Sequence, residues 1–258
     1  MQNYPPAGGA PNYAPSGMPQ GQPPKSKKGW IIGGLIGCLL LIIIIVAALG
    51  GIGYFVSRNL QSTQSTNAPA PRQPSNTKQY VNTREGRTGT LAENFVDFSF
   101  YYPDDWELNE DDTELLFVSV ERNLVEAGEK YPQEKIAVGW VSATGTARDK
   151  QLMPKFAAEF GEQLASQYPS NYRKVSEGET RIGPYAGYEF RFELRNNKDE
   201  LCGRFVLLPP PAGQTKGVVL VMAASKRVPG VTGVADVGEQ GELPVILNSF
   251  RFGSDASK

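Results

Sequence analysis

The sequence contains no histidine and only two cysteines among its 258 residues. Without histidine, the chain cannot build a Ser-His or Cys-His nucleophilic pair or a histidine-based metal site, and it lacks the commonest general base. The two thiols are Cys38, inside a long apolar run, and Cys202, so no disulfide can form within the globular part. These absences exclude most familiar hydrolase mechanisms. We expect Cys202 to be a buried, unreactive strand cysteine, with an intermolecular bridge as the alternative.

Acidic residues are missing from the first part of the chain. All 27 Asp and Glu residues follow Lys78, so the chain from Tyr80 onward has a net charge of −7 and the first 79 residues have +6. A domain of negative sign is repelled by a phosphate backbone, and no basic stripe with interleaved aromatic residues occurs in it. We therefore predict that nucleic acid is not a partner.

One long apolar run divides the chain. Trp30 to Val56 contains no charged residue over 27 positions, which is longer than the roughly 20 residues that cross a bilayer core. The run predicts a single transmembrane helix over residues 29–56, with the lipid bilayer as a partner. A lipidated Cys38 is the competing interpretation, because Leu35-Ile36-Gly37-Cys38 resembles a lipoprotein cleavage box. Only about seven apolar residues precede Cys38, however, and most of the run follows it, unlike a cleaved signal peptide.

The flanks of this run predict its orientation. Residues 1–28 are rich in Pro and Gly and should form a disordered tail. Lys25, Lys27 and Lys28 abut the run on its amino side, whereas only Arg58 and Arg72 follow closely. By the positive-inside rule the tail is cytoplasmic and the rest of the protein is extracytoplasmic, as in a single-pass protein of the bacterial cell (inner or cytoplasmic) membrane.

Three glycines are spaced for close helix packing. Gly29, Gly33 and Gly37 recur every fourth residue and so share one helix face. This spacing predicts a homodimer through the transmembrane helix. The alternative is that glycine is simply common in membrane helices.

The remainder of the chain divides into a linker and one domain. Residues 57–90 begin with a Ser-, Thr-, Gln- and Pro-rich stretch that predicts a flexible linker with a reach of roughly 25 to 30 Å. Residues 91–252 have the size of one ordinary domain, and residues 253–258 should be disordered.

Apolar residues at alternating positions predict strands in the domain, and apolar residues at about every fourth position predict helices. The expected strands cover residues 98–102, 115–120, 136–143, 188–194, 201–208 and 217–224, and the expected helices cover residues 151–167 and 243–250. The apolar stripe of the first helix consists of Leu152, Phe156, Phe160, Leu164 and Tyr168. Strands joined by hairpins, with a central and a terminal helix, predict an α+β fold with an antiparallel sheet flanked by helices.

Two groups of side chains raise the question of a ligand site. Residues 104–114 contain seven carboxylates, which could hold Ca²⁺. Their spacing matches no EF-hand loop, so a solvated strand connection is the favoured interpretation. Strand aromatics could line a pocket, although core packing is the commoner use. The aromatics concerned are Phe98, Phe100, Trp106, Trp140, Tyr188, Phe190 and Phe192. The Gly-rich stretch from Pro229 lacks the lysine of a phosphate loop and is expected to be a mobile loop.

A family resemblance follows from the motif Phe98-Ser-Phe-Tyr-Tyr-Pro-Asp-Asp-Trp106. It resembles the opening strand and turn of the PsbP/Mog1-like superfamily, and Gly187-Tyr-Glu-Phe190 and Ile246 to Phe252 follow in the expected order. The resemblance covers about residues 91–252. It implies a central antiparallel sheet flanked by helices, in a family of mostly non-catalytic modules that dock onto other proteins.

These patterns together predict a membrane-tethered, non-catalytic extracytoplasmic binding or assembly module. They imply no cofactor, no catalytic or metal-binding residue, and an envelope protein as partner. One alternative is a small-ligand carrier or carboxylate-dependent enzyme with a pocket between sheet and helix. The other is an adaptor that acts through the cytoplasmic Pro-rich tail.

Overall fold

The computed structural model describes residues 74–110, 115–126, 129–195, 200–211 and 213–253. The predicted tail, the transmembrane helix between Trp30 and Val56, and its glycines Gly29, Gly33 and Gly37 lie outside the described residues. Cys38, the first half of the predicted linker (residues 57–73) and residues 254–258 do so as well. Among the described residues, no helix is both long enough and apolar enough to cross a membrane.

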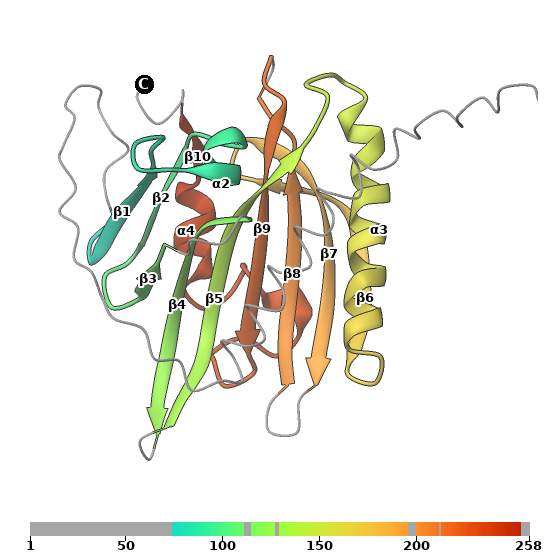
Figure 1. Ribbon diagram of the computed structural model, residues 1–258. Helices are drawn as coiled ribbons and strands as arrows, with labels where there is room; N and C mark the ends of the chain where they lie inside the picture. Colours follow the sequence, from blue (N-terminus) through green and yellow to red (C-terminus); the bar gives the residue numbers. More distant parts are fainter. Residues whose placement is uncertain (1–73, 111–114, 127–128, 196–199, 212, 254–258) are drawn as a thin grey trace, which may run out of the picture.

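Two antiparallel sheets make up most of the domain (Figure 1). The larger sheet has seven strands in the order β3 (Glu107–Asn109), β4 (Leu116–Glu126), β5 (Glu129–Ser142), β9 (Lys216–Ser225), β8 (Glu200–Leu208), β7 (Tyr185–Arg195) and β6 (Tyr172–Ile182). The smaller sheet has the order β1 (Thr77–Asn82), β2 (Phe98–Pro103) and β10 (Arg251–Phe252). The helical segments are α2 (Gly89–Glu93), α3 (Asp149–Gln167), the 3₁₀ turn η1 (Val234–Asp236) and α4 (Leu243–Ser249).

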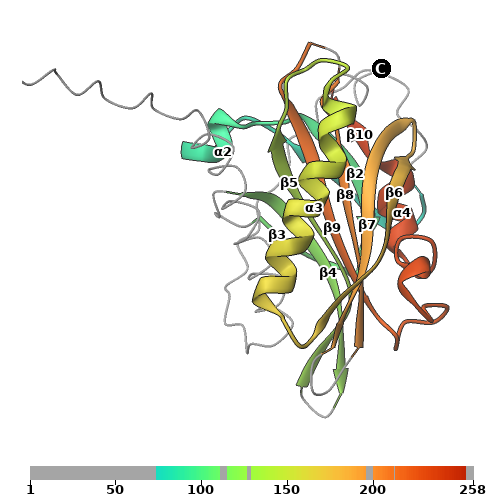
Figure 2. The same cartoon turned by 90° about the vertical axis from the view of Figure 1, so that its right-hand side faces the viewer.

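The seven-stranded sheet is covered on both faces. Figure 2 shows α3 on one face and α4 on the opposite face. In β9, Val219 and Val221 face α3, whereas Leu220 and Met222 belong to the core shared with the smaller sheet and α4. Because both faces are buried, β8 and β9 are nearly continuous apolar runs, as expected of a sheet covered on both sides.

Helix α3 is anchored by one aromatic side chain. The ring of Phe160 stacks on Phe205 of β8 at 4.0 Å between centroids and lies 5.9 Å from the ring of Phe190 of β7. The buried face of α3 is centred on Met153, Ala157, Phe160 and Leu164, while the predicted stripe members Leu152, Phe156 and Tyr168 lie half-buried at its edges. The sequence therefore located the helix correctly, and its buried face is turned slightly from the predicted one.

The predicted elements are confirmed in the order expected. The strands at 98–102, 115–120, 136–143, 188–194, 201–208 and 217–224 are β2, β4, β5, β7, β8 and β9, and the helices at 151–167 and 243–250 are α3 and α4. The structure is mostly antiparallel sheet with few helices, so it contains more sheet than the predicted α+β arrangement. The difference comes mainly from β6, which has polar side chains on both faces and therefore gives no alternating pattern.

The structure also corrects the predicted linker boundary. Residues 77–82, assigned to the 57–90 linker, form β1, and Gly89 begins α2. Tyr80 is buried, and its ring contacts Phe98 and Phe100 of β2 at 5.9 and 5.3 Å. Only Tyr80 and Asn82 of β1 are buried, so its sequence resembled a polar linker.

Candidate functional site

Most charged groups buried in the domain hold its loops and helix ends in place. Arg204 of β8 is 3% exposed, and its guanidinium contacts Glu189 of β7 at 2.8 Å and Glu239 at 3.0 Å. Burial alone would raise the pKa of Glu189, but Arg191 and Arg204 outweigh burial and hold that pKa below its usual range. This pairing satisfies the buried charges within the protein itself.

The same arginines fix the loop after β9. Arg191 donates to the carbonyl oxygens of Val234 and Ala235 at 2.8 and 2.7 Å. Val228, Val231 and Val237 of this loop are buried in the core. The prediction that the Gly-rich stretch from Pro229 is a mobile loop is therefore wrong, because its valines and the arginine contacts hold it against the sheet.

Glu134 of β5 caps the beginning of α4 from across the core. Its side chain is 1% exposed and accepts hydrogen bonds from the backbone N–H groups of Glu242 at 3.0 Å and Leu243 at 3.3 Å. Burial raises the pKa of Glu134 above its ordinary value of 4.5, although the two N–H donors oppose that shift. The carboxyl group is thus used to position a helix.

The raised pKa of Glu134 predicts a pH-dependent stability. A carboxyl group whose pKa is raised by folding binds its proton more tightly in the folded state, so its contribution favours folding below pH 4.5 and is lost as the pH rises through the raised pKa. We expect Glu134→Gln to change the melting temperature relative to wild type more favourably at about pH 7.5 than at about pH 4, because glutamine cannot ionise. Thermal unfolding at both values measures this, and an equal difference at both would contradict it.

Asp149 provides a control in which folding lowers the pKa of the carboxyl group instead of raising it. Its carboxylate accepts hydrogen bonds from Thr144 N–H at 2.8 Å and Thr144 Oγ1 at 2.6 Å, and from Thr146 N–H at 3.1 Å. Burial alone would raise the pKa of Asp149, but these donors outweigh it and lower the pKa below 3.8. The stabilisation is present above pH 3.8 and is lost as the pH falls through the lowered pKa. The cost of Asp149→Asn, about 1 kcal/mol at neutral pH, should therefore shrink in acid.

The acidic segment is not gathered into a metal site in its described part. Asp104, Asp105 and Glu107 are exposed, and Glu110 forms an ion pair with Arg87 at 3.1 Å. Residues 111–114 lie outside the described residues. Among the residues that the structure describes, no group of three or more His, Cys, Asp or Glu side chains could hold a metal ion.

The strand aromatics are used in the core. Phe98, Phe100, Trp106, Phe190 and Phe192 are buried, as predicted. Trp140 and Tyr188 are partly buried and pack against the core clusters. Cys202 is also buried, as predicted, and burial raises the pKa of its thiol.

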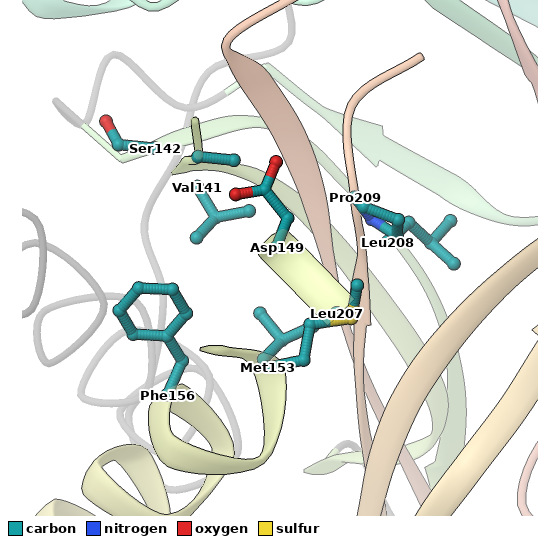
Figure 3. A pocket seen from close by; sticks show the side chains of 9 residues that line it. Val141, Ser142, Asp149, Met153, Phe156, Leu207, Leu208 and Pro209 are labelled. Atoms are coloured by element: carbon teal, nitrogen blue, oxygen red, sulfur yellow. The ribbon is translucent and has the colours of Figure 1, made fainter. Parts of the chain in front are cut away.

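A small hollow lies between α3 and the sheet (Figure 3). It has a volume of about 20 Å³ and is lined by Val141, Ser142, Ala143, Asp149, Met153, Phe156, Leu207, Leu208 and Pro209. That volume admits about one water molecule. A pocket for a small organic ligand measures roughly 300 to 1,000 Å³, so this hollow cannot enclose one.

The hollow shows which flank of α3 faces the middle of the sheet. Phe156 lines it together with Val141 of β5 and Leu207 of β8. On the opposite flank, a Cβ at Gly161 would lie 3.3 Å from the hydroxyl of Tyr172 in β6. Residues at spacings of three and four share a helix flank, so Glu159 and Gln163 lie on the same side as Phe156.

Unpartnered oxygen atoms lie along this flank. The side-chain oxygens Glu159 Oε2, Gln163 Oε1 and Gln167 Oε1 are enclosed, and they accept no hydrogen bond among the described residues. They recur every four residues, which is about 6.0 Å along the helix axis. Enclosed acceptors without donors are costly, by about 1 to 3 kcal/mol each, so donors to this row would be stabilising.

A group of buried residues lies beside α3 on the same face of the sheet. Ser119 of β4 pairs with Ala137 of β5, which pairs with Val221 of β9, so these three share the face on which α3 lies. Two residues away along the same strands, Lys135 of β5 contacts Glu121 of β4 at 2.8 Å, and Lys135 is 3% exposed. Ser119, Ala137 and Gly139 are also buried, and Ser119 Oγ is a further enclosed atom without a partner.

We call the row Phe156, Glu159, Gln163 and Gln167 the α3 flank; the neighbouring sheet residues Ser119, Lys135, Ala137 and Gly139 are buried. Helix α3 itself runs along β7 and β6 (Figure 1). The α3 flank was missed in the sequence because Glu159, Gln163 and Gln167 resemble the solvated side of an amphipathic helix. Their recurrence at every fourth residue beside the apolar stripe was the available signal.

The known proteins that are similar to this chain are solved structures. No family model matches the chain, and no curated protein matches it. The chain is similar to the solution structure of cyanobacterial PsbP from Synechocystis sp. PCC 6803, with 11% identity, a TM-score of 0.43 and coverage of 75% of this chain and 98% of that one. It is also similar to LpqN of Mycobacterium tuberculosis, a protein involved in cell envelope biogenesis, with 10% identity, a TM-score of 0.39 and coverage of 69% and 91%. Both TM-scores are below 0.5. The fold is therefore assigned from the strand pairings of this chain and not from these similarities.

Proposed function

We propose that the protein is a membrane-tethered, non-catalytic extracytoplasmic module of PsbP/Mog1-like type that binds an extended polypeptide along the α3 flank. The apolar run from Trp30 to Val56 and its flanking lysines support the tether and the orientation. The motif from Phe98 to Trp106 supports the family. A homodimer through Gly29, Gly33 and Gly37 is part of the same proposal.

The row of enclosed acceptors on α3 is the observation that carries this function. Amide groups on one side of an extended chain recur every two residues, or about 6.6 Å, which is close to the 6.0 Å spacing of Glu159, Gln163 and Gln167. An extended segment parallel to α3 can therefore donate a hydrogen bond to each of the three oxygens. Main-chain donors of this kind give affinity with little dependence on sequence.

The buried charged residues support a binding rather than a catalytic role. Arg204 and Glu189 neutralise each other, Glu134 caps α4, and Lys135 pairs with Glu121. The hollow beside Phe156 has a volume of about 20 Å³, which is far below that of a ligand pocket. This small volume disfavours the alternative in which the hollow carries a small molecule.

Crosslinking in cells tests the function. We expect the full-length protein to capture envelope proteins that are also captured when Met1 to Pro24 is deleted, because the tail is not the binding element. A variant that lacks residues 74–258 should lose them. Mass spectrometry of the captured proteins gives the result. Partners that persist without residues 74–258 would move the function to the tail or to the membrane helix.

A further inference from the structure

The outermost strand of the seven-stranded sheet has a free edge. Strand β6 ends the strand order, and among the described residues only β7 pairs with it. We propose that this edge binds an extended segment of another polypeptide as an added antiparallel strand, with basic side chains of that segment opposite Glu177 and Glu179. The site is separate from the α3 flank, because Tyr172 of β6 lies on the other side of α3, and the inference therefore goes beyond the proposed function.

The connection between β6 and β7 shows which backbone groups are free. The two strands are joined by a two-residue turn, so the flanking residues Ile182 and Tyr185 exchange both backbone hydrogen bonds. Hydrogen-bonded pairs alternate with non-bonded pairs along an antiparallel ladder. The N–H and C=O groups of Glu177, Glu179 and Arg181 therefore point away from β7, toward the free edge.

A bulge sets the length of the usable edge. The ladder with β7 shifts register between Lys174 and Ser176, and Val175 between them is 42% exposed. Because a bulge interrupts regular pairing, an added strand can pair with Ser176 to Ile182 and no further toward the amino end of β6. The bound segment is therefore short.

The charges along the edge select the partner. Glu177 and Glu179 are exposed and, being two residues apart in a strand, share one face. Glu177 forms only an exposed ion pair with Lys174 at 3.0 Å, and Glu179 forms no ion pair among the residues that the structure describes. Opposite charges directly across a ladder stabilise it, so lysine or arginine is favoured at both facing positions of the added strand.

A second copy of this chain fits the edge less well. Antiparallel pairing of two copies through all three free residues pairs Glu177 with Arg181 but places Glu179 opposite Glu179 at the centre. Like charges directly opposite each other are destabilising. A segment with two basic residues at these positions has no such conflict.

Gly178, between the two carboxylates, leaves room for a partner side chain. A Cβ added there would meet no atom within 4 Å, and the backbone does not have a positive φ, so the fold itself does not require glycine. At Gly203 of β8, by contrast, a Cβ would lie 2.2 Å from the ring of Phe192. A glycine inside a strand that packing does not require is typical of a place where another chain approaches closely. We therefore expect a large side chain between the two basic residues of the partner.

A peptide of defined sequence tests the edge. The probe is fluorescently labelled Thr-Val-Lys-Phe-Lys-Val-Thr, and its binding to the full-length protein in phosphatidylcholine nanodiscs is measured by fluorescence anisotropy. We expect saturable binding. Methylation of the two lysine amide nitrogens, which face β6 in this register, should weaken binding at least about tenfold, whereas methylation of the phenylalanine nitrogen, which faces away, should have little effect. A peptide with glutamate in place of both lysines should not bind.

Variants of the protein test the same contact from the other side. Glu179→Pro removes an N–H group at the free edge and leaves the pairing with β7 intact, so it should weaken binding at least about tenfold. The double variant Glu177→Gln, Glu179→Gln keeps the backbone and should weaken binding about fivefold, less so in high salt. The matched control Glu85→Gln, Glu162→Gln removes two exposed charges elsewhere and should leave binding unchanged. Thermal unfolding of each variant shows that it is folded.

Three outcomes would overturn the inference. The first is the absence of saturable binding, or binding that neither lysine methylation nor Glu179→Pro weakens. The second is binding that is lost in Gln163→Leu but not in Glu179→Pro, which would place the peptide on the α3 flank and support the proposed function instead. The third is a dimer of the full-length protein that Glu179→Pro dissociates, which would assign the edge to a second copy.

Discussion

Phe160→Ala is expected to lower the free energy of unfolding by about 3 to 5 kcal/mol. The side chain is 1% exposed and its ring stacks on Phe205 at 4.0 Å, in the centre of the contact between α3 and the sheet. Alanine would leave a cavity between the helix and two strands whose backbone is fixed by ladders on both sides, so the site cannot collapse to fill it. Urea unfolding, followed by circular dichroism, measures the loss.

The control for this substitution lies two residues along the same helix. Glu162 is exposed on α3, so Glu162→Ala should change the free energy of unfolding by no more than about 0.5 kcal/mol. A loss below about 1 kcal/mol for Phe160→Ala would mean that α3 is not held by the packing described here. Such a result would also remove the support for the α3 flank as a binding surface.

Arg204→Ala should destabilise the domain by about 3 to 5 kcal/mol, because it removes a buried cation and leaves the largely buried carboxylate of Glu189 with one cationic partner fewer. Arg204 also donates to Glu239 at 3.0 Å and to Thr180 Oγ1 at 3.1 Å, so its loss weakens the attachment of the loop after β9. Denaturant unfolding gives the size of the effect. Hydrogen exchange in residues 228–238 should rise at the same time.

Two comparisons identify the cause of the Arg204 effect. Arg173 pairs with Glu193 at 2.7 Å, but its side chain is 63% exposed, so Arg173→Ala should cost less than about 1 kcal/mol. The double variant Arg204→Ala, Glu189→Ala should cost less than the sum of the single variants, since it removes the isolated charge. Additive costs would show that the two side chains do not stabilise each other.

The sequence was most informative where burial and secondary structure follow the same period. Phe190 and Phe192 alternate with Glu189 and Arg191, so the strand and its two faces could be read directly. The apolar spacing around Phe160 predicted α3 in the same way. Each of these elements has one apolar side that must be covered, and that requirement leaves a regular pattern in the sequence.

Elements held by distant polar partners left no such pattern. Ten of the eleven residues of β6 are not buried, and the strand forms because its backbone pairs with β7 along its length. The loop after β9 is fixed by Arg191 and Arg204 from strands that precede it by about 30 residues or more. Arg204, a charge within an apolar strand, was a visible sign of a buried partner, but the partner could not be identified without the fold.

The attachment of β1 determines how the domain would respond to mechanical load. β1 is an edge strand joined to β2 by six residue pairs, and the chain enters at the Thr77–Pro103 pair. Tension directed away from the sheet would open that pair first and then peel the others in turn. Tension along β1 would instead shear all six pairs together, which demands a larger force. The domain would therefore be mechanically weak in one direction and resistant in the other, depending on how it is oriented relative to its tether.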